Sequence, residues 1–124
     1  MRQTSEELAL VKRAIELPYL LSSLEIDKNK ILDSNVKMKS LYVNHLDHMQ
    51  NKISLEMYKL KLSMKKHHIK IIKENRSELS LSVDYSLKGY RHEMTLLWSK
   101  VKVDITLILT EEMNLDITNL NRQT

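Results

Sequence analysis

The chain has 124 residues, of which 42% are hydrophobic and 29% are charged, and its formal net charge is +4 at pH 7. These values are typical of one folded domain and exclude an intrinsically disordered polypeptide. The sequence contains no cysteine, which excludes disulfides, thiolate metal sites and a cysteine nucleophile, and which fits a reducing compartment. It also lacks the long apolar run of a membrane span and the uninterrupted apolar stretch of a signal peptide. We therefore expect a single cytoplasmic domain over residues 1–124 that makes no membrane contact.

A first helix is predicted from Thr4, because Thr4 and Glu7 have the spacing of a capping box. Apolar residues then follow at helical spacing: Leu8, Val11 and Ile15. Pro18 lacks an N–H and crowds the preceding turn, so we expect it to end or kink this helix near Leu17. Helical spacing then resumes, and the letters DSN at residues 33–35 predict a stop followed by a new N-cap.

A second helix over about residues 35–67 is predicted from two apolar stripes. The first stripe recurs at steps of three and four residues: Leu46, Met49, Ile53, Met57, Leu60 and Met64. The second stripe lies on nearly the opposite side: Leu41, Leu55, Tyr58 and Leu62. A helix that is apolar on two sides is typical of a central element, or of one that is shared with a partner molecule.

After His68 the apolar period changes from that of a helix to that of a strand. Apolar and polar residues alternate over residues 79–87, which predicts a strand with one solvated face. The letters HIKIIK at residues 68–73 predict its partner strand, and ENRSE at residues 74–78 predicts the hairpin loop. Gly89 separates this hairpin from a last helix, which is predicted from the spacing of Met94, Leu97, Val101, Ile105 and Ile108. Residues 98–110 also fit a strand, and the tail from about residue 114 is polar.

The expected fold class is α+β and mainly helical, in the order helix, helix, strand, strand, helix. It consists of a long central helix with flanking helices and one β-hairpin. A helix of about 33 residues spans roughly 50 Å, whereas a domain of this size has a radius of gyration of about 14 Å. We therefore predict a homodimer that buries the second stripe, Leu41, Leu55, Tyr58 and Leu62. The alternative is that helices from residues 4–32 and 90–113 cover both stripes within one chain.

Positive charge is concentrated in one segment, because residues 57–76 carry seven basic side chains and one acidic side chain. The seven are Lys59, Lys61, Lys65, Lys66, Lys70, Lys73 and Arg76. Clustered cations favour contact with polyanions, so these residues are candidate contacts to nucleic acid. The alternative is that the lysines form the solvated flanks of a helix and stabilise its C-terminal end. Only Arg76 could read a base with two hydrogen bonds, which weakens the case for sequence-specific recognition.

Other candidate chemistry is limited to histidines. His45 and His48 lie one helical turn apart, a spacing that suits a transition metal, although surface decoration is the commoner role of such a pair. His67 and His68 are neighbours whose side chains point differently, so they form no chelate. With Gly89 as the only glycine, a glycine-rich phosphate loop cannot be built. We predict no catalytic residue, no metal site and no cofactor.

Three segments, LPYLLSSLEIDKNKI, HHIKII and SLKGYRHEM, give the chain a resemblance to small uncharacterised proteins of bacilli and their mobile elements. The resemblance covers most of the chain. It implies a bacterial or phage accessory protein, and it implies neither an activity nor site residues. We predict a small non-enzymatic regulator or adaptor that acts by contact with a protein partner of unknown identity. The alternative is a nucleic-acid-binding protein that uses residues 59–76.

Overall fold

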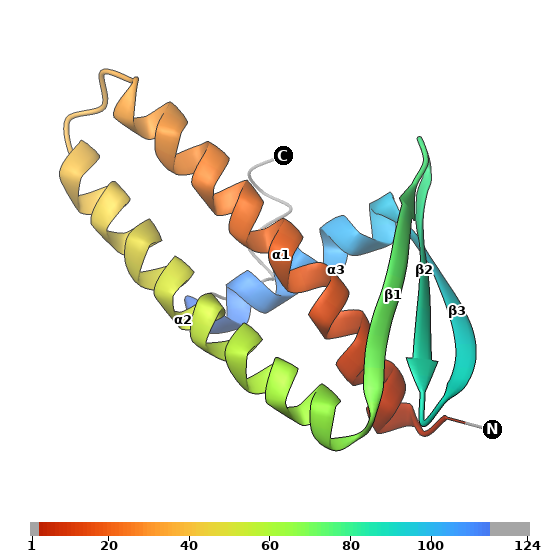
Figure 1. The fold of residues 1–124 in the computed structure, drawn as a ribbon. Coiled ribbons are helices and arrows are strands. Elements are labelled where there is room, and N and C mark those ends of the chain that lie inside the picture. Colours follow the sequence, from red (N-terminus) through yellow and green to blue (C-terminus); the bar gives the residue numbers. More distant parts are fainter. Residues whose placement is uncertain (1–2, 115–124) are drawn as a thin grey trace.

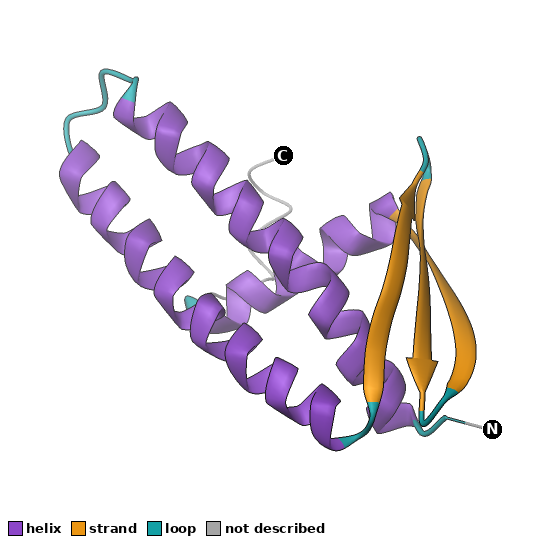
Figure 2. Cartoon of the chain, in the orientation of Figure 1, coloured by secondary structure: helices purple, strands orange, loops and turns teal. Residues whose placement is uncertain are grey.

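The computed structural model describes residues 3–114, and within this range it has three helices and three strands. In chain order these are α1 (Ser5–Leu32), α2 (Lys39–Lys66), β1 (Ile69–Arg76), β2 (Ser80–Leu87), β3 (Tyr90–Leu97) and α3 (Trp98–Glu112). Figure 1 shows α1 and α2 as an antiparallel pair, with α3 crossing behind them. The strands gather at one end of the molecule (Figure 2). No helix in the described range has both the length and the apolar character needed to cross a membrane. The predicted polar tail lies outside the described residues from residue 115 onward.

The predicted order of helix, helix, hairpin and helix is wrong, because residues 90–97 form a third strand. The sheet is antiparallel with the order β1-β2-β3. Lys88 and Gly89 have φ angles of 52° and 87°, which are those of a two-residue type I′ turn. This turn returns the chain directly alongside β2, so that Tyr90 pairs with Leu87 instead of opening a helix. Residues 98–110, which fitted either a helix or a strand, are helical.

The predicted long central helix is also wrong, because α1 and not α2 occupies the centre. Both helices have 28 residues. α1 packs against both α2 and α3, and it supplies buried residues to two apolar clusters. The sheet cluster comprises Val11, Ile15, Met64, Ile69, Leu81, Val83, Tyr85, Leu87, Leu96 and Val101. The helical cluster comprises Leu17, Leu20, Leu24, Met49, Ile53 and Ile108.

The start of α1 confirms the predicted capping box. The Thr4 amide donates to Glu7 Oε1 at 2.9 Å, and the Glu7 amide donates to Thr4 Oγ1 at 3.1 Å. The predicted break near Leu17 is wrong, since α1 continues through Pro18 to Leu32. Leu17 and Leu20, on either side of Pro18, are both buried in the helical cluster, so tertiary packing outweighs the local preference.

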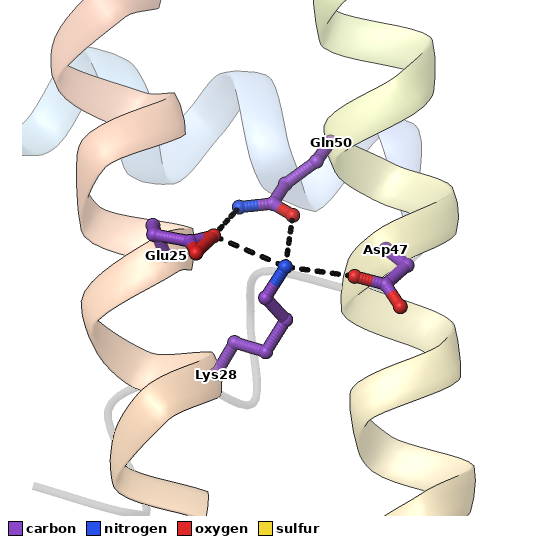
Figure 3. A network of polar contacts seen from close by, with 4 residues as sticks. All are labelled: Glu25, Lys28, Asp47 and Gln50. Carbon is purple, nitrogen blue, oxygen red and sulfur yellow. Dashed lines mark hydrogen bonds and ion pairs between the residues drawn. The ribbon is translucent and has the colours of Figure 1, made fainter. Parts of the chain in front are cut away.

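Polar contacts hold α1 and α2 in register (Figure 3). Lys28 Nζ donates to Asp47 Oδ1 at 2.8 Å and to Gln50 Oε1 at 3.0 Å. Gln50 Nε2 in turn donates to Glu25 Oε2 at 2.9 Å, and Lys28 Nζ lies 3.1 Å from the same oxygen. Because these bonds cross from one helix to the other, they fix how far α2 is displaced along α1.

The sheet has one buried face, and β2 lies at its centre. Leu81, Val83, Tyr85 and Leu87 are buried, and the residues between them are partly exposed, as the alternating pattern predicted. β1 is an edge strand, and its pairing with β2 is interrupted by a β-bulge at Ile72. The bulge carries Ile72 out of the ladder, so the backbone between Ile69 and Ile71 forms a short regular stretch of its own.

Candidate functional site

A groove of about 680 Å³ lies between the C-terminal half of α2 and β1. Figure 1 shows α2 and β1 diverging from the turn that joins them. His68, with a φ angle of 58°, supplies the left-handed residue that ends α2 and redirects the chain. The groove opens where the two elements separate. Its apolar lining is Ala14, Met57, Leu60, Met64, Ile69 and Ile71.

The charged residues around this groove are all basic. Lys61 and Lys65 line it from α2, and Lys70 lines it from β1. None of these three lysines forms an ion pair within residues 3–114, whereas Lys12, Lys28 and Arg13 all do. The groove therefore combines an apolar lining with uncompensated positive charge on its α2 wall.

The structure does not bring the seven predicted basic residues together on one surface. Lys59 and Lys66 are exposed on the side of α2 that faces away from α1, as helical geometry places them relative to the buried Met49 and Ile53. Arg76 lies over the ring of Tyr19, with its guanidinium carbon 5.2 Å from the ring centroid. Tyr19 also packs edge to face against Trp98, with the two ring centroids 5.3 Å apart. The only arginine of the segment therefore takes part in a packing contact.

The predicted self-association stripe lies on the outer side of α2. Each of its four residues is more than half exposed: Leu41, Leu55, Tyr58 and Leu62. α1 and α3 therefore leave it uncovered, and the alternative in which helices of the same chain bury both stripes is wrong. Leu55, Tyr58 and Leu62 lie within two helical turns and form one patch, which we call the outer patch. Leu41 lies almost four turns before Leu55 and stands apart from it.

Four of the histidines lie on α2 or directly after it. His45 and His48 are both exposed on α2. His67 Nδ1 lies 3.6 Å from Glu7 Oε2, next to the capping box of α1, and His68 lines the groove. The described residues contain no group of three or more metal-ligating side chains.

A second cavity, of about 250 Å³, lies between α1 and α3, and it is lined by two carboxyl groups that the sequence analysis did not predict, the buried Glu16 and the partly buried Asp104. Glu16 is only 3% exposed, and burial followed by hydrogen bonding to Asp104 raises its pKa to about 8. Burial alone would also raise the pKa of Asp104, but hydrogen bonds from Glu16, Lys12 and Lys100 lower it to about 2. Lys12 Nζ lies 2.8 Å from Asp104 Oδ2, and Lys100 Nζ lies 3.1 Å from Oδ1. With a pKa of about 8, Glu16 is mostly protonated at neutral pH, whereas Asp104 is charged.

The sequence contains one signal for this pair. Lys12 and Glu16 lie one helical turn apart, and Glu16 stands between Ile15 and Leu17, which are both buried. An acid inside such an apolar run indicates burial. The identity of its partner depends on the crossing of α3, which the local sequence does not reveal.

Comparison with known proteins identifies one family. A family model described as YhjD protein matches residues 2–117, which include every element that lines the groove. No curated protein and no solved structure gave a match. Because the family match spans nearly the whole chain, this protein belongs to the YhjD protein family.

Proposed function

We propose that this chain is a small non-enzymatic accessory protein of a bacterium or a phage, and that it acts in the cytoplasm as a regulator or adaptor by contact with another protein. The observation that carries the proposal is the open apolar groove between α2 and β1, with Lys61 and Lys65, which form no ion pair within residues 3–114. The methionine and aliphatic side chains of the groove offer apolar contact area, and its lysines offer charge, as a binding surface requires. The resemblance to small proteins of bacilli and their mobile elements supports the bacterial or phage origin.

The outer patch supports a further part of this proposal, a homodimer. Leu55, Tyr58 and Leu62 expose apolar side chains within two turns of α2, and the exposed Leu41 lies apart from them near the start of the same helix. A twofold symmetric contact buries the same patch on both copies, which is the commonest way for a chain to cover such a surface. None of the outer-patch residues lines the groove.

Site-specific photo-crosslinking in the native host tests the adaptor role. A photoreactive side chain at Met57 samples the groove, one at Leu55 samples the outer patch, and one at the exposed Asp27 of α1 is the control. We expect a different protein to be captured from Met57, the chain itself from Leu55, and neither from Asp27. Equal capture from all three positions, or no protein captured from Met57, contradicts the proposal.

Light scattering of the purified chain tests the dimer. We expect a dimer mass at high micromolar concentration, and a monomer mass for the variant Leu55→Lys with Leu62→Lys. Both residues are more than half exposed, so the helical circular dichroism of this variant should be unchanged. A monomer mass for the unmodified chain removes the dimer from the proposal.

The exposed lysines support nucleic-acid binding as the second candidate function. Titration of the chain with duplex DNA and with RNA over a salt series separates the two candidates. Binding that weakens with a log–log slope of about −0.9 per neutralised phosphate favours this candidate. Absence of binding at low salt eliminates it.

A further inference from the structure

We propose that the groove between α2 and β1 binds a short acidic peptide segment that carries apolar side chains and that adds to the free edge of β1 as a fourth strand. The inference deepens the proposed function and rests on it, because it names the chemistry and the conformation of the protein partner. Three independent features of the groove carry it: the lining, the charge and the strand edge.

The apolar lining provides the contact area for the partner's side chains. Met57 and Leu60 are partly buried at the margin of the helical cluster, whereas Met64 and Ile69 belong to the sheet cluster. The groove therefore lies where the two clusters meet, and the residues at the edge of each cluster are accessible from the groove. Its volume of about 680 Å³ lies within the range of sites that bury most of a bound ligand. Methionine side chains adapt to partners of different shape, so Met57 and Met64 suit a peptide surface.

The charge around the groove determines the sign of the partner. Lys61 and Lys65 lie four residues apart on α2, where two like charges repel each other. Lys70 lies between Ile69 and Ile71 on β1, and strand alternation places its side chain on the other face of the sheet. Because the described residues provide no carboxylate to pair with Lys61 or Lys65, carboxylates from a partner would relieve this repulsion on the α2 wall. Complementary charge of this kind also accelerates association and rejects basic partners.

The hydrogen-bonding pattern of the sheet determines the conformation of the partner. The Lys88 amide donates to the His68 carbonyl at 2.9 Å, and Ile69 stands opposite Leu87 in the register. In an antiparallel pair, the backbone N–H and C=O groups of one residue bond to the neighbouring strand, and those of the next residue point away from it. The backbone groups of Ile69 and Ile71 therefore point away from β2, toward the free edge of the sheet, while their side chains line the groove. An extended segment can bond to both residues, and the bulge at Ile72 limits the pairing to this short stretch.

Lysines and a bulge on an edge strand also prevent two identical sheets from pairing edge to edge. This protection depends on the charge of the approaching strand, because it works through positive charge. A second copy of the chain presents its own lysines at the same edge and is rejected, whereas an acidic segment is attracted. The edge therefore favours an acidic partner over self-pairing through the sheet.

Selection from a randomised display library on the intact chain tests the partner's chemistry. We expect enriched peptides to combine glutamate or aspartate with aliphatic or aromatic residues. Enrichment of basic peptides, or of no peptide, overturns the inference. An enriched peptide is then titrated into the chain with isotope-labelled methionine methyl groups. We expect signals of Met57 and Met64 to shift while that of Met38, exposed at the start of α2, stays unchanged. Shifts that spare Met57 and Met64 overturn the site.

Two variants separate the charge of the groove from charge elsewhere on α2. Lys61→Gln with Lys65→Gln should weaken peptide binding by about tenfold or more. Lys59→Gln with Lys66→Gln removes the same charge from the other side of the helix and should change binding by less than about twofold. Equal losses in the two variants mean that the peptide responds to net charge, and the groove is then not its site.

Methylation of alternate backbone nitrogens in the peptide tests strand addition. We expect methylation in one register to abolish binding, and methylation in the other register to preserve it, because only alternate residues face β1. A peptide that tolerates both registers binds by its side chains alone, which overturns the strand pairing.

Failure of this inference can be distinguished from failure of the proposed function. Capture of a protein from Met57 in the host, together with a preference for basic or neutral peptides, leaves the adaptor role intact and removes the acidic partner. Binding of acidic peptides without any capture in the host supports the peptide chemistry of the groove and contradicts the adaptor role.

Discussion

The substitution Glu16→Gln tests the carboxyl pair at the contact between α1 and α3. Glutamine has nearly the same size as glutamate and can donate a hydrogen bond to Asp104 from its amide group. It cannot ionise at any pH at which the protein is folded. The substitution therefore removes the titration of Glu16 and preserves the packing and the hydrogen bond.

The expected effect follows from the pKa of Glu16, which is about 8 in the folded chain against an ordinary value of 4.5. Between these two pH values the folded state holds a proton that the unfolded state has released. The free energy of unfolding therefore falls as the pH rises from 4.5 to about 8, and it is unaffected by this group at lower pH. The full pKa difference corresponds to about 5 kcal/mol. At pH 8 the carboxyl of the folded chain is about half ionised, so most of this difference has been lost, and we expect Glu16→Gln to stabilise the protein by about 4 kcal/mol at that pH. The pKa of Asp104 is about 2, so Asp104 stays charged throughout this window.

Urea unfolding followed by circular dichroism, at about pH 5 and about pH 8, measures the effect. The gain in the free energy of unfolding should be small at the lower pH and large at the higher one. Glu111→Gln is the matched control, because Glu111 lines the same cavity and is exposed. Its pH profile should follow that of the unmodified chain. A stability change from Glu16→Gln that is equal at both pH values would refute the reasoning. Glu16 would then have the same pKa in the folded and the unfolded state. Destabilisation at both would mean that Glu16 is ionised and paired with Lys12.

Three further substitutions test the local interpretation of the fold by the same unfolding assay. Thr4→Ala removes one half of the capping box and should lower the free energy of unfolding by about 1 kcal/mol. The control Ser5→Ala, one residue later, should change it far less. Equal losses in the two variants contradict the assignment of the cap. Gly89→Ala should cost about 1–2 kcal/mol through its left-handed backbone alone, because the space around it is open. Gly89→Asn should cost less, and a larger loss for asparagine contradicts the backbone explanation. Pro18→Ala should raise the free energy of unfolding by about 1–3 kcal/mol.

The sequence predicted those elements whose signals are local. The capping box at Thr4 and Glu7 and the alternation in β2 are both present, because each depends on a few neighbouring residues. β3 was missed because its pattern is ambiguous. The pair Leu96–Leu97 allows Met94 to continue either at strand spacing to Leu96 or at helix spacing to Leu97. The turn at Lys88–Gly89 decides between them, and it lacks the asparagine or aspartate that usually identifies such a hairpin.

The candidate site could be predicted only in part. The concentration of lysines between Lys59 and Lys73 is visible in the sequence, and so is the second stripe of α2. The division of these lysines between the groove and the outer side of α2 follows from the helix period once the buried face is known. The groove itself depends on the angle at which β1 leaves α2 after His68, and no local pattern encodes that angle. The role of Arg76 depends in the same way on Tyr19, far away in the chain.

Pro18 shows how packing decides against a local signal. Without an N–H on Pro18, the Ala14 carbonyl loses its usual donor, and proline in a helix interior costs about 3 kcal/mol. Burial of Leu17 and of Leu20 contributes about 1.5–3 kcal/mol each, which is enough to offset this cost and keep α1 continuous. If α1 is only strained at Pro18, Pro18→Ala restores the donor and stabilises the chain. Ser22→Ala, one turn later on the exposed side, is the control and should have little effect. Val11 and Ile15 belong to the sheet cluster, however, and Leu20 and Leu24 to the helical cluster, so the change of cluster occurs close to Pro18. A loss of stability in Pro18→Ala would therefore mean that a bend at Pro18 lets α1 reach both clusters, and the sign of the change distinguishes strain from a required bend.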